Sequence, residues 1–480
     1  MSVKVDSPTI DVVLVKAIKR DQSGKSTRYA GSSRINLKPF LTENSSVTMT
    51  RTINAPAGSF HITVGDRDYT NYGVIDSLYG IAEPMDVIEI RLSRNPHKYK
   101  EKLPMVFRGV ITEVRRDESI GQDGKPQRTV IVSGHDWGKF LQIYVDKKLK
   151  GNPLNMDWLS NTVMETHYKI PYRVRTAGNL MTEVVDKVAN KFMATFDDAN
   201  TFVPYTIDVS SAYDKDMVMP QGYNSNSMNS LWDFIKVYGD LGAFNEWYID
   251  DLEDSAHIIY RKPPFYAGTE SIYGTVNWES VAIEANQVQR LSVSRSDADV
   301  ANVVWVDHPR MTQYTGSDYL FMQMGQNPDD LLIKTPNSTP SLYGIRSLDV
   351  TSQHGNIEQA APESELTVSK SAYKNYLLDK IKKLKLANQD NVVLEKGSMV
   401  VQGNEDIKVG RILTIQRSDF VATYYAQSVT HTFAPFRAFT TTVNFIRGGG
   451  FDQRSRNDAV GVTNPYLQEI GRGPYEDRKK

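Results

Sequence analysis

Two stretches far apart in the sequence share one pattern of strands, turns and glycines. In Pro84–Gly134, the residues from Val87 predict a strand, FRGVITEV a second, and QRTVIVSG a third, with the turn-forming segment SIGQDGKPQ before the last. In Val409–Gly448, the segments VGRILTIQR, VATYYAQSVTHTF and FTTTVNFIRG repeat the order strand, strand, turn, strand and closing glycine. This repetition predicts two related β-domains in one chain.

The first β-domain is predicted to span residues 1–148. Apolar or alternating strands are expected at Ile10–Ile18, Ser46–Ile53 and Ser59–Val64, followed by the unit described above. Short strands punctuated by turns are typical of a sandwich or a small barrel.

Residues 149–285 are predicted to form an α+β insertion between the two β-domains. Apolar residues at helical spacing predict helices at Asn179–Met193 and Ser227–Leu241, and a further helix is expected at Asn155–Tyr168. The segment Glu246–Arg261 indicates a β-hairpin with LEDS as its turn.

The second β-domain is predicted at 286–447, and residues 448–480 are expected to form an extended C-terminal tail. VQRLSVSRSDADVANVVWVD predicts two strands around a polar segment. Residues 308–360 are rich in Pro, Asn, Gly, Ser and Asp, which indicates a long excursion, and loops of this length are usually functional or ordered by a partner. A helix is expected at 362–386, with Ile381 and Leu384 on its apolar face.

Composition excludes several classes of site. The chain has 480 residues, a formal net charge of -1 and no cysteine. The charge gives no overall attraction to nucleic acid or an anionic membrane, and the lack of cysteine excludes disulfides and thiolate metal sites. No apolar stretch approaches the roughly 20 residues that span a bilayer, so no membrane insertion is expected.

Two motifs resemble catalytic or phosphate-binding signatures. Gly24, Lys25 and Ser26 match the end of a phosphate-binding loop, but Lys19 stands where that loop needs a glycine, which favours an ordinary hairpin turn. Ser133, His135 and Asp136 are sequence neighbours, whereas a triad converges from separate parts of a fold. We interpret SGHDWG as a strand end with a capping Asp136 and a buried Trp137.

The histidines, the clustered carboxylates and the clustered lysines also match no specific binding pattern. The histidines lack metal-site spacing, and the carboxylates of the hairpin turn lack the pattern of a calcium loop, which favours a solvated turn. The lysines of KIKKLKLANQ are expected on a solvated helix face rather than on a nucleic acid. The histidines are His61, His97, His135, His167, His257, His308, His354 and His431; the carboxylates are Asp250, Asp251, Glu253 and Asp254; the lysines are Lys380, Lys382, Lys383 and Lys385.

A group of aromatic residues is expected in the core or at a subunit interface rather than as a platform for bases. These residues are Trp232, Phe234, Tyr238, Phe244, Trp247 and Tyr248. We assign no catalytic residue, no cofactor-binding residue and no metal ligand, and the chain is not expected to be an enzyme.

The order of these parts resembles the baseplate hub proteins of contractile-tailed bacteriophages, a superfamily that includes the late-control tail proteins and the hub part of type VI secretion spike proteins. The resemblance is carried by FRGVITEV, by VIVSGHDWGKFL, by the polar run of Ser296–Val304, and by VGRILTI and FTTTVNF. It covers most of residues 1–450 and involves no catalytic signature.

The resemblance implies a mainly β fold with two tail-tube-like β-barrel domains per chain, assembled as a homotrimer that gives a pseudo-sixfold ring. Such a hub adapts the sixfold tail tube to the threefold spike and forms part of the DNA ejection channel. The chain lacks a β-helix repeat, so the resemblance implies a separate trimeric spike protein. Further implied partners are tail tube or tube-initiator ring proteins, baseplate wedge proteins and, as a candidate, the tape measure protein. The implied location is the virion tail baseplate, after assembly in the host bacterial cytoplasm, with DNA only in transit.

Three other functions remain open at this point. A peptidoglycan hydrolase would need an acid and a nucleophile that converge in a cleft, and the sequence offers no candidate pair. A receptor- or carbohydrate-binding β-protein at the tail periphery would explain the 25 tyrosines but not the duplicated unit. The hub of a phage-like contractile injection particle without DNA would have the same sequence features.

Overall fold

The structure is a computed structural model. It describes residues 7–17, 34–65, 68–71, 74–99, 102–120, 126–143, 175–196, 201–213, 217–218, 230–267, 270–274, 276, 278–307, 331–352, 378–417 and 420–449. The statements below concern these residues.

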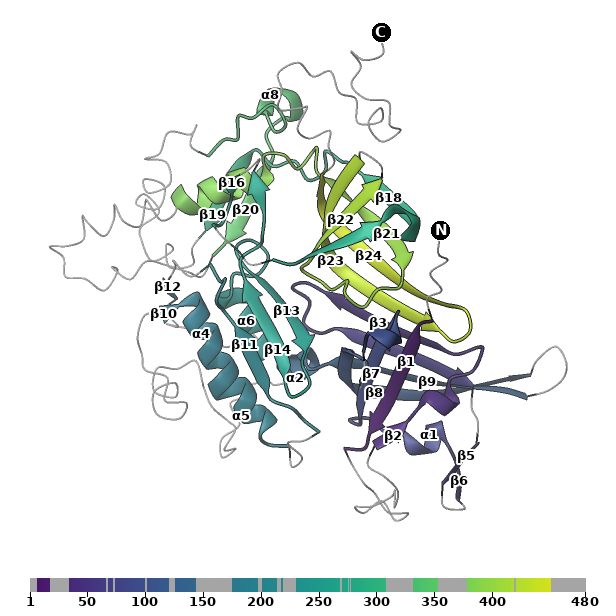
Figure 1. Ribbon diagram of the computed structural model, residues 1–480. Coiled ribbons are helices and arrows are strands. Elements are labelled where there is room, and N and C mark those ends of the chain that lie inside the picture. Colours follow the sequence, from purple (N-terminus) through teal and green to yellow (C-terminus); the bar gives the residue numbers. More distant parts are fainter. Residues whose placement is uncertain are drawn as a thin grey trace, which may run out of the picture.

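A 13-stranded sheet organises the molecule (Figure 1). Its main path is β18-β21-β24-β23-β3-β4-β9-β8-β7-β1-β2, and β22 and β17 branch from β23. All neighbours on the path are antiparallel, whereas β17 and β22 are parallel. The strands are β1 (Thr9–Val15), β2 (Arg34–Asn36), β3 (Ser46–Thr52), β4 (Ser59–Gly65), β7 (Val87–Ser93), β8 (Met105–Ile120), β9 (Pro126–Asp136), β17 (Ser280–Glu284), β18 (Val288–Ser294), β21 (Glu395–Gln402), β22 (Ile412–Arg417), β23 (Phe420–Ala434) and β24 (Ala438–Gly449).

Helices and a three-stranded sheet form a separate body beside the large sheet. One long helix consists of α4 (Ala177–Val184), a π-helical turn η3 (Val185–Ala189) and α5 (Asn190–Met193). The small sheet has the order β11-β14-β13, and α6 belongs to the same body. These elements are β11 (Tyr205–Asp208), α6 (Leu231–Tyr238), β13 (Glu246–Asp251) and β14 (Ala256–Arg261).

The remaining elements are short. They are η1 (Lys38–Phe40), β5 (Asp68–Asn71), β6 (Val74–Ser77), α1 (Leu78–Ile81), η2 (Pro96–Lys98), α2 (Gly138–Ile143), β10 (Arg175–Thr176), β12 (Met217–Val218), β15 (Tyr266–Ala267), β16 (Glu270–Ser271), η4 (Ala285–Gln287), β19 (Val303–Asp307), α8 (Pro340–Tyr343) and β20 (Ser347–Thr351). Residues 378–388 form a further helix. The predicted excursion thus contains α8 and β20, and β20 pairs in parallel with β19.

Two groups of five strands have the same internal order. We call β3, β4, β7, β8 and β9 the first unit, and β18, β21, β22, β23 and β24 the second unit. If the strands of each unit are numbered along the chain, both units have the spatial order 1-2-5-4-3. Both fourth strands also carry an irregularity at the same place in their ladder, between Ile111 and Glu113 in β8 and between Ala426 and Ser428 in β23. The repetition predicted from the sequence is therefore confirmed as a repeated strand topology.

The described strands do not form two closed barrels, which corrects that part of the expected fold. The second half of β23 pairs with β3, from Ser428 opposite Thr52 to Phe433 opposite Val47. This ladder joins both units into one open sheet. The physical reason is length: β23 has 15 residues and β22 has 6, so β22 occupies only the first half of that edge of β23.

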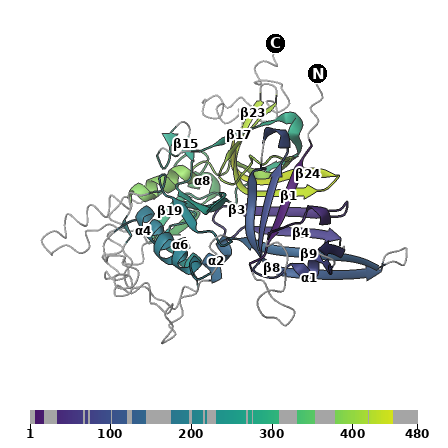
Figure 2. The same ribbon diagram turned by 60° about the horizontal axis from the view of Figure 1, so that its bottom comes forward.

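The units are oriented alike in the sheet. Each of the four ladders that lead from β23 through β3, β4 and β9 to β8 is antiparallel, so β8 and β23 run parallel to each other. The hairpins β8–β9 and β23–β24 therefore project from the same end of the sheet (Figures 1 and 2).

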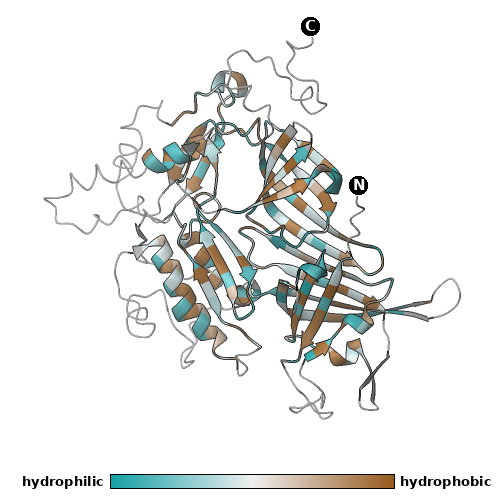
Figure 3. Cartoon of the chain, viewed as in Figure 1, coloured by the Kyte–Doolittle hydropathy of each residue, from teal (hydrophilic) through white to brown (hydrophobic). Residues whose placement is uncertain are grey.

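Alternating burial along the strands supplies the cores. In β4, for example, Phe60, Ile62 and Val64 are buried while the intervening residues are more exposed, and Figure 3 shows hydrophobic and hydrophilic residues alternating along the strands. One hydrophobic cluster fills each unit, a third fills the insertion, and a fourth lies under β19 and the helix over 378–388.

The predicted helices are confirmed where the structure describes them. The helix predicted at 179–193 begins slightly earlier, because Thr176 caps it by accepting a hydrogen bond from the Asn179 amide. Helix α6 is capped by Ser230 and ends before Asp240, whose φ of 46° cannot continue a right-handed helix. The helix predicted at 155–168, and the first part of the one predicted at 362–386, lie outside the described residues.

The two units exchange a glycine and a phenylalanine at one position. Phe60 in β4 lies opposite Gly134 in β9, whereas in the second unit Gly397 in β21 lies opposite Phe445 in β24. A Cβ atom on Gly134 would lie 2.0 Å from Val110 O and 2.6 Å from the Phe60 ring. The glycine therefore makes room for the aromatic ring across the ladder.

Replacement of Gly134 by alanine tests this arrangement. We expect Gly134→Ala to lower the free energy of unfolding by about 1–3 kcal/mol, because the backbone and the Phe60 ring must both move. Gly65→Ala is the matched control, since a Cβ there meets only Thr42 Oγ1 at 3.7 Å. Urea denaturation followed by fluorescence measures both, and equal stability of the two variants would contradict the packing argument.

Candidate functional site

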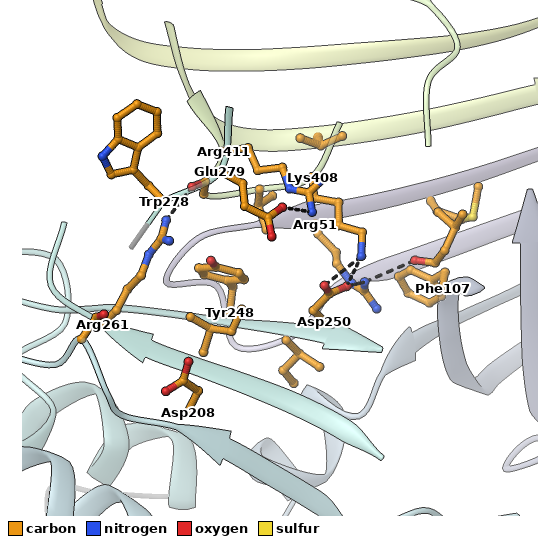
Figure 4. A pocket seen from close by; sticks show the side chains of 18 of the residues that line it. Arg51, Phe107, Asp208, Tyr248, Asp250, Arg261, Trp278, Glu279, Lys408 and Arg411 are labelled. Atoms are coloured by element: carbon orange, nitrogen blue, oxygen red, sulfur yellow. Dashed lines mark hydrogen bonds and ion pairs between the residues drawn. The ribbon is translucent and has the colours of Figure 1, made fainter. Parts of the chain in front are cut away.

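The hairpin β13–β14 lies where the insertion meets both units. A cavity of about 280 Å³ opens beside it (Figure 4). Its walls come from β3, β8, β23, the small sheet of the insertion, and the segment that precedes β22. Four cations and three carboxylates line it: Arg51, Arg261, Lys408, Arg411, Asp208, Asp250 and Glu279.

Arg51 of β3 is the central cation of this junction. It forms a hydrogen-bonded ion pair with Asp251, and its Nε lies 3.5 Å from Asp136 Oδ2. Its guanidinium also lies over the Phe107 ring, 4.8 Å from the centroid. Asp251 in turn accepts a hydrogen bond of 2.7 Å from the Arg108 amide. The last residue of β13 is thereby held between two strands of the first unit.

The turn of the hairpin makes a second set of contacts with the first unit. Glu253 forms a bidentate pair with Arg91 of β7, with one contact of 2.7 Å, and Lys102 Nζ lies 2.7 Å from the same carboxylate. The Arg108 guanidinium donates to Glu253 O at 2.6 Å. Bidentate geometry fixes orientation as well as distance, so the turn has one defined position on the sheet.

The other side of the hairpin contacts the second unit. Lys408 Nζ lies 2.8 Å from Asp250 Oδ2. Arg261 of β14 donates to Gly410 O at 2.5 Å, and Tyr425 OH donates to Glu246 Oε2 at 2.5 Å. The hairpin therefore links the insertion to both units at once.

Burial and ion pairing act in opposite directions on these carboxylates. Burial alone would raise the pKa of Asp250, but Lys408 and Arg51 lower it below its usual value. Hydrogen bonds from Arg91 lower the pKa of Glu253 to about 2. For Glu246, burial prevails and raises the pKa despite Arg261.

His431 is the one histidine that lines the cavity. Its Nε2 lies 3.1 Å from Ile407 O and its Nδ1 lies 3.0 Å from Thr441 Oγ1, so a neutral ring donates to the carbonyl and accepts from the hydroxyl. Burial lowers the pKa of His431 to about 4, and the hydrogen bond to Ile407 only partly offsets this effect.

The chemistry of the cavity is that of a structural joint. Among its described lining residues, the charged groups of Arg51, Lys408 and Arg411 each face a carboxylate, and both ring nitrogens of His431 are engaged. General acid–base catalysis needs a proton-transferring group within reach of a reacting atom. Here the three cations and His431 make contacts that join separate parts of the chain.

The motif SGHDWG forms a strand end. Asp136 Oδ1 accepts a hydrogen bond of 3.0 Å from the Gly138 amide, and Trp137 is fully buried. His135 Nδ1 lies near Gly58 O rather than near a nucleophile. The interpretation of Asp136 as a cap and Trp137 as a core residue is confirmed.

The carboxylates of the hairpin correct the sequence interpretation. The hairpin and its LEDS turn are confirmed, but Asp250, Asp251 and Glu253 are not merely solvated. Asp251 is buried, and all three are paired with cations of the large sheet. Their partners are about 150 to 200 residues away in sequence, so no local pattern reveals them.

The lysines of the last helix give a second correction. Lys380 is 0% exposed; its Nζ lies 3.0 Å from Asp240 Oδ2 and 4.3 Å from the centroid of the Phe244 ring. Lys383 is also buried and pairs with Asp379, while Lys382 is exposed. A helix whose lysines are partly buried against the insertion does not present the continuous basic face that a nucleic acid would need.

The other predicted groups are as follows. The six aromatic residues of the insertion are all buried, which confirms that they belong to the core. The described residues contain no group of three or more potential ligands placed to hold a metal ion. No described helix is long and apolar enough to cross a membrane. Gly24–Ser26, His167, His308 and His354 lie outside the described residues.

No sequence motif pointed to Arg51, Arg91, Arg108 or Lys408. The signal that could have found two of them, Arg91 and Arg108, is an arginine within a largely apolar strand, as in VIEIRLS and MVFRGV. A charge at such a position needs a partner when it is buried, and the carboxylates of the hairpin provide it for Arg51 and Arg91.

Several solved structures are similar to this chain, whereas no protein-family model and no curated protein sequence matches it. The tail protein from Neisseria meningitidis has a TM-score of 0.47 at 10% identity, with 92% of this chain and 96% of that chain covered. The 43 kDa tail protein of a Shewanella oneidensis prophage has a TM-score of 0.45 at 10% identity, with 92% and 97% covered. An Escherichia coli component of the type VI secretion system has a TM-score of 0.37 at 11% identity, with 84% and 74% covered. Two of these three proteins are described as tail proteins, and the third as a component of a secretion system.

Replacement of Asp251 tests the joint. We expect Asp251→Asn to lower the free energy of unfolding by about 3 kcal/mol, because it leaves the buried Arg51 with only its weaker partners. Asp254→Asn is the control: Asp254 is exposed in the same turn and should change stability by no more than about 0.5 kcal/mol. Thermal and urea denaturation measure both variants, and a neutral Asp251→Asn would show that the pair does not hold the hairpin.

His431 predicts a pH dependence. The unfolded chain binds a proton at this histidine below about pH 6.5, whereas the folded chain resists protonation until about pH 4. Stability from this group is therefore fully present above pH 6.5 and is lost by up to about 1.4 kcal/mol per pH unit as the pH falls through that window. Urea denaturation between pH 7 and pH 5 should show a smaller decrease in the free energy of unfolding for His431→Gln than for the wild type. Parallel pH profiles would contradict the prediction.

Proposed function

We propose that this chain is a structural subunit of a phage tail baseplate and forms the central hub as a homotrimer. The observation that carries the proposal is the identical strand order of the first and second units, with the same irregularity in their fourth strands. A chain that contains one unit twice provides six equivalent units when three copies assemble.

Symmetry explains why such a protein is needed. A tail tube built of sixfold rings and a spike with threefold symmetry cannot make equivalent contacts directly. A trimer with two similar units per chain presents six similar surfaces to the tube and three identical surfaces to the spike. The repeated topology thus matches the adaptor role that the sequence resemblance implies.

The differences between the units provide the threefold features. In the first unit, only residues 53–58 connect β3 to β4, whereas in the second unit residues 295–394 connect β18 to β21. The joint around Arg51, Asp250 and Glu253 fixes the insertion to both units. We propose domains at 1–148, 149–285, 286–447 and 448–480, with the insertion and the excursion at 308–360 directed to neighbouring subunits and the spike.

The proposed partners follow from this role. They are a separate trimeric spike protein on one side, tube or tube-initiator ring proteins on the other, and wedge proteins around the hub, with DNA passing through the lumen. The protein would be assembled in the host cytoplasm and located in the virion tail baseplate. A non-enzymatic role is supported by the cavity at the joint, whose charges are engaged in holding the fold.

The oligomeric state tests the proposal. Light scattering after gel filtration should give three times the 54.2 kDa chain mass, and negative-stain images should show a threefold ring with a lumen and six similar lobes. A compact monomer would favour the binding protein at the tail periphery. A solid trimer without a lumen would also contradict the hub.

A further inference from the structure

Among the strand edges that pair with no described strand, two have an equivalent in the other unit. One is the second half of β8, from residue 112 to 120: β7 pairs only with the first half of that edge, up to Val110, and β9 occupies the opposite edge. The other is the outer edge of β18, which pairs only with β21 and ends the sheet. Unpaired backbone groups along a strand are a template for another strand.

The equivalents of these two edges in the other unit pair with each other inside the chain. The fourth strand of the second unit, β23, uses its second half to pair with β3, the first strand of the first unit. In the first unit the fourth strand is β8, and in the second unit the first strand is β18. The chain therefore contains one complete junction between units and the two separate halves of another.

Burial differs between the paired and unpaired versions of the same position. Val293 of β18 lies opposite Gly397 of β21, and Met49 of β3 lies opposite Phe60 of β4. Because Gly397 and Phe60 occupy the same position in their units, Val293 is equivalent to Met49. Met49 is 2% exposed, whereas Val293 is 38% exposed. In the fourth strands, Val429 is buried and Val114 of β8 is half-buried. The unpaired edges thus expose apolar side chains that their counterparts bury.

We infer that the second half of β8 pairs antiparallel with β18, and with the two residues that follow it, of a second copy of this chain. The inference rests on the proposed function, since it specifies how the subunits of the ring are joined. The internal junction gives the register, because the irregularities in β8 and β23 align the two fourth strands. The expected pairs are Glu113 with the partner subunit's Ser296, Val114 with the partner's Arg295, Arg115 with the partner's Ser294, Arg116 with the partner's Val293, Asp117 with the partner's Ser292 and Glu118 with the partner's Leu291.

The side chains suit this register. At the internal junction, one face of the sheet carries pairs of hydroxyl groups. The Oγ1 atoms of Thr50 and Thr430 lie 3.0 Å apart, and Thr52 Oγ1 lies 2.8 Å from Ser428 Oγ. In the inferred junction, serines of β18 face charged residues of β8 on that surface, where a hydroxyl can bond either sign of charge. On the other face, Leu291 and Val293 occupy the positions of Val47 and Met49. There the long side chains of the partner's Glu118 and the partner's Arg116 replace Phe433 and His431, and their aliphatic stems can cover the apolar residues. The charges on β8 also discourage pairing with unrelated strands.

Engineered cysteines test the junction, because the chain contains no cysteine of its own. We expect the double variant Arg115→Cys, Ser294→Cys to form disulfides between subunits upon mild oxidation, giving covalent dimers and trimers on a non-reducing gel. Thr50→Cys, Thr430→Cys is the positive control at the equivalent internal position and should oxidise within one chain. Arg115→Cys, Ser292→Cys shifts the register by two residues, to a diagonal separation of about 7–8 Å, and should oxidise poorly.

The outcomes separate the junction from the proposed function. Covalent trimers from the 115/294 variant support both. A trimer in solution without this disulfide, or with the 115/292 disulfide preferred, overturns the inferred junction and leaves the hub intact. A protein that remains monomeric at its highest soluble concentration overturns both.

A second variant tests the junction without disulfide chemistry. Val293→Lys places a positive charge on a side chain that is 38% exposed in the single chain and that the junction would set opposite Arg116 of the partner subunit. We expect this variant to retain its circular dichroism spectrum and to shift from trimer to folded monomer, because like charges directly opposite each other repel. Phe436→Asp is the control, since Phe436 in the turn between β23 and β24 is 88% exposed, lies outside the inferred junction and should leave the trimer unchanged. A Val293→Lys protein that remains a trimer overturns the inferred junction.

Discussion

The ladder between β23 and β3 is the contact on which the rest of the structure depends. It joins residues almost 380 positions apart in the chain, and it merges two units into one sheet. Backbone hydrogen bonds repeat along the ladder, so the relative position of the units is set by strand geometry rather than by a flexible linker. The joint at the hairpin and the two unpaired edges both follow from this arrangement.

The ion pairs around the hairpin β13–β14 fix the position of the insertion on the large sheet. Carboxylates from one hairpin, at Asp250, Asp251 and Glu253, meet cations from both units. Buried ion pairs contribute little net stability once the cost of removing both charges from water is counted, but an unpaired buried charge is strongly unfavourable. The hairpin therefore has one favourable position on the large sheet. An insertion attached in this way would keep a fixed position in the proposed trimeric ring.

The first and second units repeat one strand topology but differ at individual residues. The two units share strand order and a strand irregularity, yet Phe60 and Gly134 exchange roles with Gly397 and Phe445. The long connections, by contrast, are not repeated: the insertion lies between the two units, and residues 295–394 lie within the second unit only. Loops at strand ends tolerate insertions because they leave the ladders intact. Such a chain can keep six similar surfaces and still present threefold features.

The sequence by itself determined the local elements and the repetition. Alternating apolar residues predicted β3 and β4, helical spacing predicted the helix through α4 and α5, and turn residues placed the hairpin β13–β14; each of these depends on neighbours within a few residues. Only the tertiary structure decided that the two units share one open sheet, that Lys380 is buried, and that Asp251 meets Arg51. These outcomes depend on contacts between residues about 140 to 380 positions apart in the chain. A buried charge or an unpaired strand edge is unfavourable unless a partner is present, and no local sequence pattern specifies that partner.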